Sequence, residues 1–357
     1  MYPFRNLTLK ILRLRMLLPR RDFITALAFW LVISAGLVLF DSLTRPFDNK
    51  LKDFKIKFNA TYMQSYIPAP VLLLAIDNET LADPKAQYKW PWPRSHWAKI
   101  LRRINDEGQP KAIVIDVYFQ QAMTDDETEL KELAEAIGDS GKVGLVALYE
   151  DVNSAFGHQI HFEKPPLKLR NKAAFWGHTI QPVDDDGKTR SFLLKDKDVD
   201  CRHISWELLE RLDFKIPHLD EISARKKSVA LLDFSASQNY VEQITIKELF
   251  DDENNFELLK DRIVVIGATA RVLHDIHQSP ISEITGPMLI CNSIATLGAG
   301  RFQLLNDNLL RRLLYYFAGA LMAIFIFSDF LKDNIRQMIV SWLMLPVLLF
   351  FYSFAPL

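Results

Sequence analysis

The chain has 357 residues, in which 43 lysines and arginines are balanced by 44 aspartates and glutamates, giving a net charge of −1. This even balance excludes proteins that bind nucleic acid through a strongly basic surface, so no nucleic acid is expected as a partner. The 2 cysteines are too few for a scaffold held together by disulfides.

The first predicted element is a transmembrane helix at 23–40, an uncharged run preceded by six basic residues and one acidic residue in positions 1–22. Its length as a helix, about 27 Å, is close to the hydrocarbon thickness of a bilayer. The excess of basic residues predicts that 1–22 is cytoplasmic and that the helix leads outward. No small-x-small site precedes Asp41, so we expect an uncleaved anchor instead of a signal peptide.

Residues 41–310 have the composition of a soluble domain, and this orientation places them outside the cytoplasm. In the first half of the domain, periodicity and capping signals predict helices at 41–65, 78–82, 96–107 and 124–137, and apolar runs predict strands at 71–76, 112–117 and 142–148. Continuously apolar strands that alternate with helices predict a mainly parallel sheet with helices on its faces.

The second half of the domain is more irregular. Strands 175–180 and 191–194 are expected to form a hairpin around a turn at Asp186-Gly187. Helices are expected at 203–212 and 285–299, and strands at 228–234, 241–244 and 262–267. The fold class predicted for the whole domain is therefore α/β, with a mixed, mainly parallel sheet flanked by helices.

Two more uncharged runs, at 313–328 and 338–357, follow the domain. They predict transmembrane helices at 311–328 and 338–357, joined by a short cytoplasmic link at 329–337. The alternative, in which the three apolar runs are buried helices of a soluble core, suits charge-free segments of this length less well. The membrane is therefore an expected partner.

Candidate binding residues follow the predicted strands, because ligands of open α/β sheets gather at the carboxyl ends of the strands. We expect Asp77, Asp116, Asp275 and Arg94 to share one crevice, and these four residues and His277 are the candidates for binding a ligand. Simpler roles remain open for three of these residues. Asp77 would equally cap the next helix. Asp116, costly to bury unpaired, would bond loop amides or pair with Arg94. His277 would be a loop or packing residue.

Several other features carry less chemistry. Asp184, Asp185 and Asp186 before Gly187 resemble the start of a calcium loop, but the twelfth loop position is Lys195 and not glutamate. The tryptophans at 90, 92 and 97 are expected to pack together. Cys201 and Cys291 could form a bridge in an oxidising compartment, but their apolar neighbours favour two buried free thiols. No metal site and no cofactor are expected. The sequence contains no Walker loop, GxGxxG, GxSxG or HExxH motif, so no enzyme of these classes is expected.

An ordered set of segments resembles the extracellular CHASE domain of the second type, which is associated with cyclases and histidine kinases. The segments are Ile76-Asp-Asn-Glu-Thr80, Trp90-Pro-Trp-Pro-Arg94, Ile113–Phe119, Asp184–Arg190, Ile263–Ala268, Asp275–Pro280 and Gly286-Pro287. The resemblance covers about residues 41–300. It implies a sensory module of a bacterial inner membrane, with its large domain in the periplasm or outside and with a ligand that the family does not specify.

Three functions are compatible with these observations. Members of the family commonly carry a cytoplasmic output domain, for which this chain has no room after its last predicted span. The leading hypothesis is therefore a sensor that signals through a separate partner protein, with a small-molecule ligand and an oligomeric state left open. The alternatives are a scaffold subunit of an envelope complex and, third, a hydrolase that uses Asp77, Asp116 and Asp275 around a divalent cation.

Overall fold

The computed structural model of the protein describes residues 41–62, 70–83, 88–120, 127–154, 157–217, 219–236, 241–300 and 302–305. The chain divides into one unit formed by Met1–Lys55 and Asn306–Leu357 and a second unit formed by Ile56–Leu305. Of the first unit, only the beginning of helix α3 is described. The second unit is the α/β domain.

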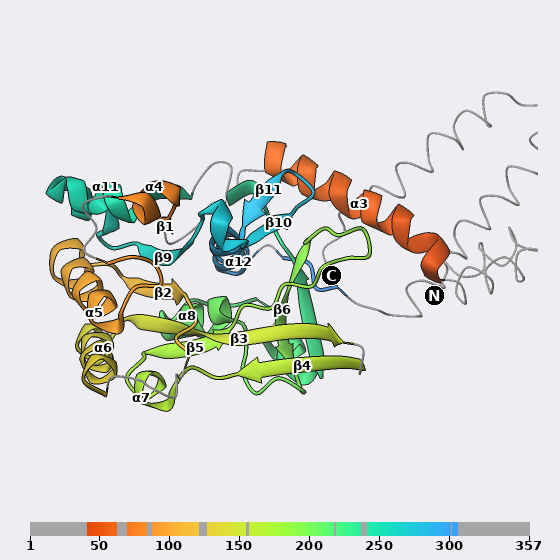
Figure 1. Ribbon diagram of the computed structural model, residues 1–357. Helices are drawn as coiled ribbons and strands as arrows, with labels where there is room; N and C mark the ends of the chain where they lie inside the picture. The colour runs from red at the N-terminus through yellow and green to blue at the C-terminus, as the bar shows by residue number, and fades with distance from the viewer. Residues whose placement is uncertain are drawn as a thin grey trace, which may run out of the picture. The chain divides into compact units, whose positions relative to one another are not determined.

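The elements follow one another in chain order as shown in Figure 1. The strands are β1 (Val71–Ile76), β2 (Ala112–Asp116), β3 (Val143–Ser154), β4 (Gly157–Glu163), β5 (Phe175–His178), β6 (Ser191–Asp196), β7 (Lys227–Leu231), β8 (Glu242–Thr245), β9 (Ile263–Ala268), β10 (Ile276–Gln278) and β11 (Glu283–Thr285). The helices are α3 (Asp41–Tyr62), α4 (Asn78–Ala82), α5 (Arg94–Arg103), α6 (Glu127–Ser140), α7 (Leu167–Arg170), α8 (Ile204–Arg211), α9 (Leu219–Ala224), α11 (Ile246–Asp251) and α12 (Gly286–Gly298). A π-helical turn η1 (Ile104–Gly108) and 3-10 helices η2 (Glu253–Leu259) and η3 (Arg271–Leu273) complete the described part.

The main sheet is almost entirely parallel. Its strands follow the order β8-β1-β9-β2-β3, and β5 pairs with the first half of β3, all in parallel. The second half of β3 pairs antiparallel with β4. Because β9 enters the sheet between β1 and β2, the ends of three strands far apart in sequence meet at one edge.

Both faces of the sheet are buried, which explains why the strand sequences are continuously apolar. Alternate residues point to opposite faces: Leu72 and Leu74 pack in one core, and Val71 and Leu73 pack in the other. The core of Leu72 and Leu74 is covered by α5, α6, α11 and η2, of which α5 and α6 lie side by side (Figure 1). The opposite core is covered by α8, α12 and the β6–β7 pair.

The predicted alternation of strands and helices is confirmed, and the fold is a mixed α/β fold with a mainly parallel sheet flanked by helices. The predicted strand 142–148 is longer, because β3 continues to Ser154 to pair with β4. The helix expected at 124–137 is described from Glu127 and ends at Ser140.

A regular hairpin between 175–180 and 191–194 is wrong, because strands β5 and β6 pair with other strands. β5 joins the main sheet beside β3, and the ring of Phe175 packs over Gly144, where a β-carbon would lie 2.0 Å from Cε2 of Phe175. β6 pairs with β7 instead. What remains of the hairpin is a short stretch around the turn. The Gly187 amide donates to the Asp184 carbonyl at 2.8 Å, Val183 and Thr189 form an antiparallel bridge, and the Leu193 amide donates to the Ile180 carbonyl at 3.0 Å. The physical reason is burial, because an apolar strand such as β5 gains more from a sheet covered on both faces than from a two-stranded ribbon.

In the part of the chain that the structure describes, no helix is both long and apolar enough to cross a bilayer. The three predicted spans, at 23–40, 311–328 and 338–357, lie outside the described residues, as do the flanking segments 1–22 and 329–337. The spans therefore remain predictions.

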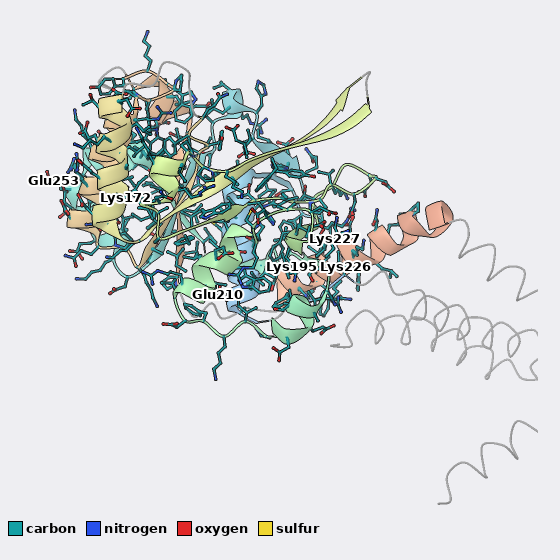
Figure 2. All side chains as sticks on the ribbon, turned by 90° about the horizontal axis from the view of Figure 1, so that it is seen from below. Lys172, Lys195, Glu210, Lys226, Lys227 and Glu253 are labelled. Atoms are coloured by element: carbon teal, nitrogen blue, oxygen red, sulfur yellow. The ribbon has the colours of Figure 1, made fainter. Side chains whose placement is uncertain are left out.

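The last described residues extend the β6–β7 pair. The Leu305 amide donates to the Val229 carbonyl at 2.7 Å and the Leu231 amide donates to the Gln303 carbonyl at 2.9 Å. Residues 303–305 therefore run antiparallel to β7, toward the end at which β7 begins. Figure 2 shows Lys195, Lys226 and Lys227 gathered at that end.

Candidate functional site

The candidate site lies where β2 and β9 end. Asp116 is the last residue of β2 and is paired in register with Gly267 of β9. On the other side of β9, Ala75 of β1 is paired with the same glycine. The parallel arrangement thus brings the ends of β1, β9 and β2 to one edge, as expected for a binding site of an open α/β sheet.

Asp116 is a carboxyl group with an unusual protonation equilibrium. Burial, and after it the nearby carboxylate of Asp275, raise its pKa to about 8. Asp116 is only partly buried as a residue, yet the dense packing of protein around its carboxyl group disfavours the charged form. No hydrogen bond from the described residues offsets the penalty of charging it. Asp116 is therefore largely protonated at neutral pH.

Asp275 lies against the beginning of α12. A β-carbon added to Gly286 would be 2.3 and 2.4 Å from the two carboxylate oxygens, so only glycine leaves room for this carboxylate. The Gly286 amide donates to the backbone carbonyl of Asp275 at 3.2 Å. A carboxylate at a helix N-terminus is favoured by the helix dipole. His277 Nε2 lies 3.1 Å from Oδ1 of Asp275, so these two side chains form one polar cluster.

The same end of α12 rests on the sheet. A β-carbon on Gly267 would be 2.4 Å from Cγ of Pro287 and 3.1 Å from Cβ of Asp116. One turn later on α12, burial and then the charge of Asp116 raise the pKa of the Cys291 thiol. The first turn of α12 thus packs against the Asp275 carboxylate, and Cys291 one turn later lies within electrostatic reach of Asp116. Cys291 is buried and free, as predicted, and Cys201 is also free but only partly buried.

The other two predicted residues make local contacts. Oδ1 of Asp77 accepts from the Thr80 amide at 2.8 Å and caps α4, which was the simpler of the two predicted roles. Nη2 of Arg94 donates to the Gln120 carbonyl at 2.5 Å and holds the loop after β2. The structure therefore brings together Asp116, Asp275 and His277, and a role in ligand binding for any of the five residues stays a prediction.

No group of three or more histidine, cysteine, aspartate or glutamate side chains within the described ranges is arranged to hold a metal ion. The acidic turn at 184–186 has another use. Asp184 and Asp186 accept from the buried guanidinium of Arg190 at distances of 2.6–2.8 Å. The hydrogen bond from Arg190 to Asp186 is the main cause that lowers the pKa of Asp186 to about 2. The carboxylates of this exposed turn thus pair with a buried arginine, which is a different use from that of a calcium loop.

The sequence did not reveal three residues that shape the site. None of Gly286, Pro287 and Cys291 was a candidate site residue, although glycine before a proline at the start of a helix marks how that helix begins. The predicted tryptophan cluster is confirmed, since the rings of Trp92 and Trp97 lie 5.3 Å apart.

The fold and the edge site define an open-sheet α/β domain whose ligands are expected at the carboxyl ends of its strands. A family model, that of the CHASE2 domain, matches residues 24–328, and the chain belongs to the CHASE2 family. This is a family of extracellular sensory domains, which fits a domain in the periplasm. Comparisons with curated proteins and with solved structures found no match.

Proposed function

We propose that this protein is a membrane-anchored sensor subunit with an extracytoplasmic CHASE2 domain, and that it signals through a separate partner protein. A ligand binds at the carboxyl edge of the sheet and changes how α12 is seated there. The chain after α12 passes the change to the predicted span at 311–328. A ligand shifts such an equilibrium only by the difference in its affinity for the two seatings.

The observation that supports this proposal is the position of α12. Its first turn packs against Asp275 and against Gly267, the register partner of Asp116, while residues 303–305, which follow it closely, pair with β7. Nearly all residues of α12 between Gly286 and Leu297 are buried, so the helix is a stiff element inside the core. A helix of this length spans about 20 Å. One element therefore connects the carboxyl edge to the segment that leads out of the domain.

The experiment has two stages. Proteins that co-purify with the full chain from detergent extracts are identified first, because the partner defines the output. Output of that partner is then compared in cells that carry the full chain and in cells that carry a chain without 56–305. A sensor requires the output to change. Unchanged output after this deletion would contradict the proposal.

A scaffold role is the second candidate, and a strand edge without a neighbour among the described residues favours it. β8 ends the main sheet beyond β1, and Glu242 and Gln243 on β8 are exposed. An edge of this kind offers backbone groups to a strand of another protein. Stoichiometric partners whose binding survives in the full chain but is lost when proline replaces Gln243, with output independent of any small molecule, would favour the scaffold.

A further inference from the structure

A pocket of about 330 Å³ lies beside the site described above, at the ends of β8 and β9 and under the β10–β11 pair. None of the five residues predicted from the sequence lines it. Gln243 of β8, Thr269 after β9 and Met288 of α12 are among its walls, so three distant segments of the chain converge on it. The volume is at the lower end of the range of pockets that hold small ligands.

Two polar side chains in the pocket have unused hydrogen-bonding capacity. Oγ1 of Thr269 is buried and has no partner among the described residues. Thr285 is the N-cap residue of α12, yet its side chain makes no capping hydrogen bond, although threonine at this position normally does. A buried hydroxyl without a partner is unfavourable, and a ligand that bonds to it removes that penalty.

The charges on the pocket cancel. Nη2 of Arg271 lies 3.0 Å from Oε2 of Glu283, and both side chains are largely exposed at the rim. Nε2 of the Gln278 side chain also donates to Oε1 of Glu283, at 3.3 Å. Since the only charged residues that line the pocket pair with each other, the described lining favours neither an anion nor a cation.

The rest of the lining is mixed, with Ser279 and Ser282 beside several apolar side chains. Phe234, Ile276 and Ile284 line the pocket together with Met288. Apolar groups beside free hydroxyls suit a ligand with one apolar face and one hydrogen-bonding edge. Thr285 is the N-cap residue of α12, and Met288 lies in its first turn. An occupant of the pocket therefore contacts the same helix end that packs against the carboxyl-edge site.

We propose that this pocket binds a small uncharged ligand of the neutral sugar class, a ring with an apolar face and hydroxyl groups along its edge. The inference deepens and rests on the proposed sensor function, since it names the class of ligand that is sensed. It concerns binding alone, however, and is tested separately from signalling.

The test uses the full chain in detergent micelles, titrated with glucose, galactose and N-acetylglucosamine, and with glucuronate as a charged analogue. Calorimetry gives the affinity and thermal unfolding gives the Tm. At least one neutral sugar is expected to bind saturably and to raise Tm. Glucuronate is expected to bind at least about tenfold more weakly, because its carboxylate would be desolvated without a free partner.

Thr269→Val separates a binding role from a structural one. It removes a hydroxyl that has no partner, so the Tm of the chain without sugar is expected to stay the same or rise. The affinity for the sugar is expected to fall about three- to tenfold, the effect of one neutral hydrogen bond. Thr80→Val is the matched control, because the Thr80 hydroxyl is likewise buried without a partner but does not line the pocket. The control is expected to leave the affinity unchanged.

Three outcomes would overturn the inference: no saturable binding of any of the neutral sugars at millimolar concentration, glucuronate binding as tightly as they do, or equal losses of affinity in the two threonine variants. The two proposals fail separately. Sugar binding without any change in partner output would contradict the sensor function and leave the pocket assigned. Output that depends on the domain without sugar binding would contradict this inference alone.

Discussion

At the residue scale, Asp116 links the pH of the surroundings to the stability of the domain. Its pKa is raised from an ordinary 3.8 to about 8, so between these values the folded chain binds a proton that the unfolded chain does not. This contribution to stability is complete below the ordinary pKa and is lost as pH rises through about 8. The free energy of unfolding should therefore decrease toward alkaline pH.

Asp116→Asn is expected to remove this dependence, because the amide has nearly the same shape and cannot be charged. At pH 8 the variant should be more stable than the parent chain by at least about 1 kcal/mol, because the folded parent chain resists ionisation of Asp116 and the unfolded chain does not. Urea unfolding at pH 5 and pH 8 measures the effect. If the difference in the free energy of unfolding between the parent chain and Asp116→Asn is the same at pH 5 and pH 8, the raised pKa of Asp116 is contradicted.

Two buried histidines produce the opposite dependence. His178 and His203 are inaccessible to solvent and their rings lie 5.5 Å apart. Burial lowers the pKa of His178 to about 3, and burial followed by the neighbouring His178 lowers the pKa of His203 as well. Below the ordinary pKa of 6.5 the unfolded chain binds protons that the folded chain does not, so stability falls as pH falls from 6.5 toward 3.

His178→Asn is expected to make the loss of stability between pH 7 and pH 5 shallower, even though the smaller side chain lowers stability at pH 7. Urea unfolding across this range provides the slope. His274→Asn is the control, because His274 is exposed and adopts a left-handed conformation, φ 56°, that asparagine tolerates. A slope changed equally in both variants would show that the buried pair is not responsible.

How far individual residues could be predicted depends on their chemistry. A charged residue inside an apolar run is conspicuous, and Asp116 was singled out for that reason. Asp275 and His277 were found because they follow a strand. The use of Asp77 as a helix cap and of Arg94 as a loop anchor depends on hydrogen bonds to the backbone, which many residues make. The pocket residue Thr269 gave no signal, because an unpaired hydroxyl is a property of the folded structure.

At the scale of elements, the seating of α12 on β9 depends on Gly267. A β-carbon there would meet the rigid ring of Pro287 at 2.4 Å, so Gly267→Ala must displace the helix. We expect a loss of about 1–3 kcal/mol in the free energy of unfolding, which is typical of overpacking. Urea unfolding measures the loss.

Gly138→Ala in α6 is the matched control. The nearest atom to its added β-carbon is Cδ of Lys172, at 3.1 Å, the far part of a flexible side chain. Alanine is the better helix residue, so this variant should gain up to about 1 kcal/mol. A loss from Gly267→Ala no larger than the change in the control would show that α12 is not held at this point.

Strands with continuous apolar sequences were predictable, because burial on both faces leaves a strong pattern. β1, β2 and β9 are of this kind, and their predicted bounds differ from the structure by at most one residue. The pairing of β5 was not predictable, since a short apolar strand fits a hairpin or a parallel sheet equally well. β10 and β11 were missed, because strands of three residues each carry no periodicity.

At the scale of the whole molecule, the predicted order of strands and helices led to the right class of fold, because each local preference agrees with a sheet covered on both faces. The position of β9 between β1 and β2 could not be predicted from the sequence. It depends on a long-range choice of neighbours, and it determines which carboxyl ends meet at the edge.

The central claim at this scale is that the domain faces away from the cytoplasm while both of its ends lead to lipid. It is tested by labelling single cysteines in intact cells with a membrane-impermeant maleimide. Glu253 is a suitable position (Figure 2), because its side chain is 89% exposed. A cysteine in place of Lys10, in the predicted cytoplasmic segment, is the control, and the parent chain gives the background from Cys201.

The account predicts that Glu253→Cys is labelled in cells whose inner membrane is intact, whereas Lys10→Cys is labelled only after that membrane is ruptured. Labelling of Glu253→Cys only after rupture would place the domain in the cytoplasm and contradict the account.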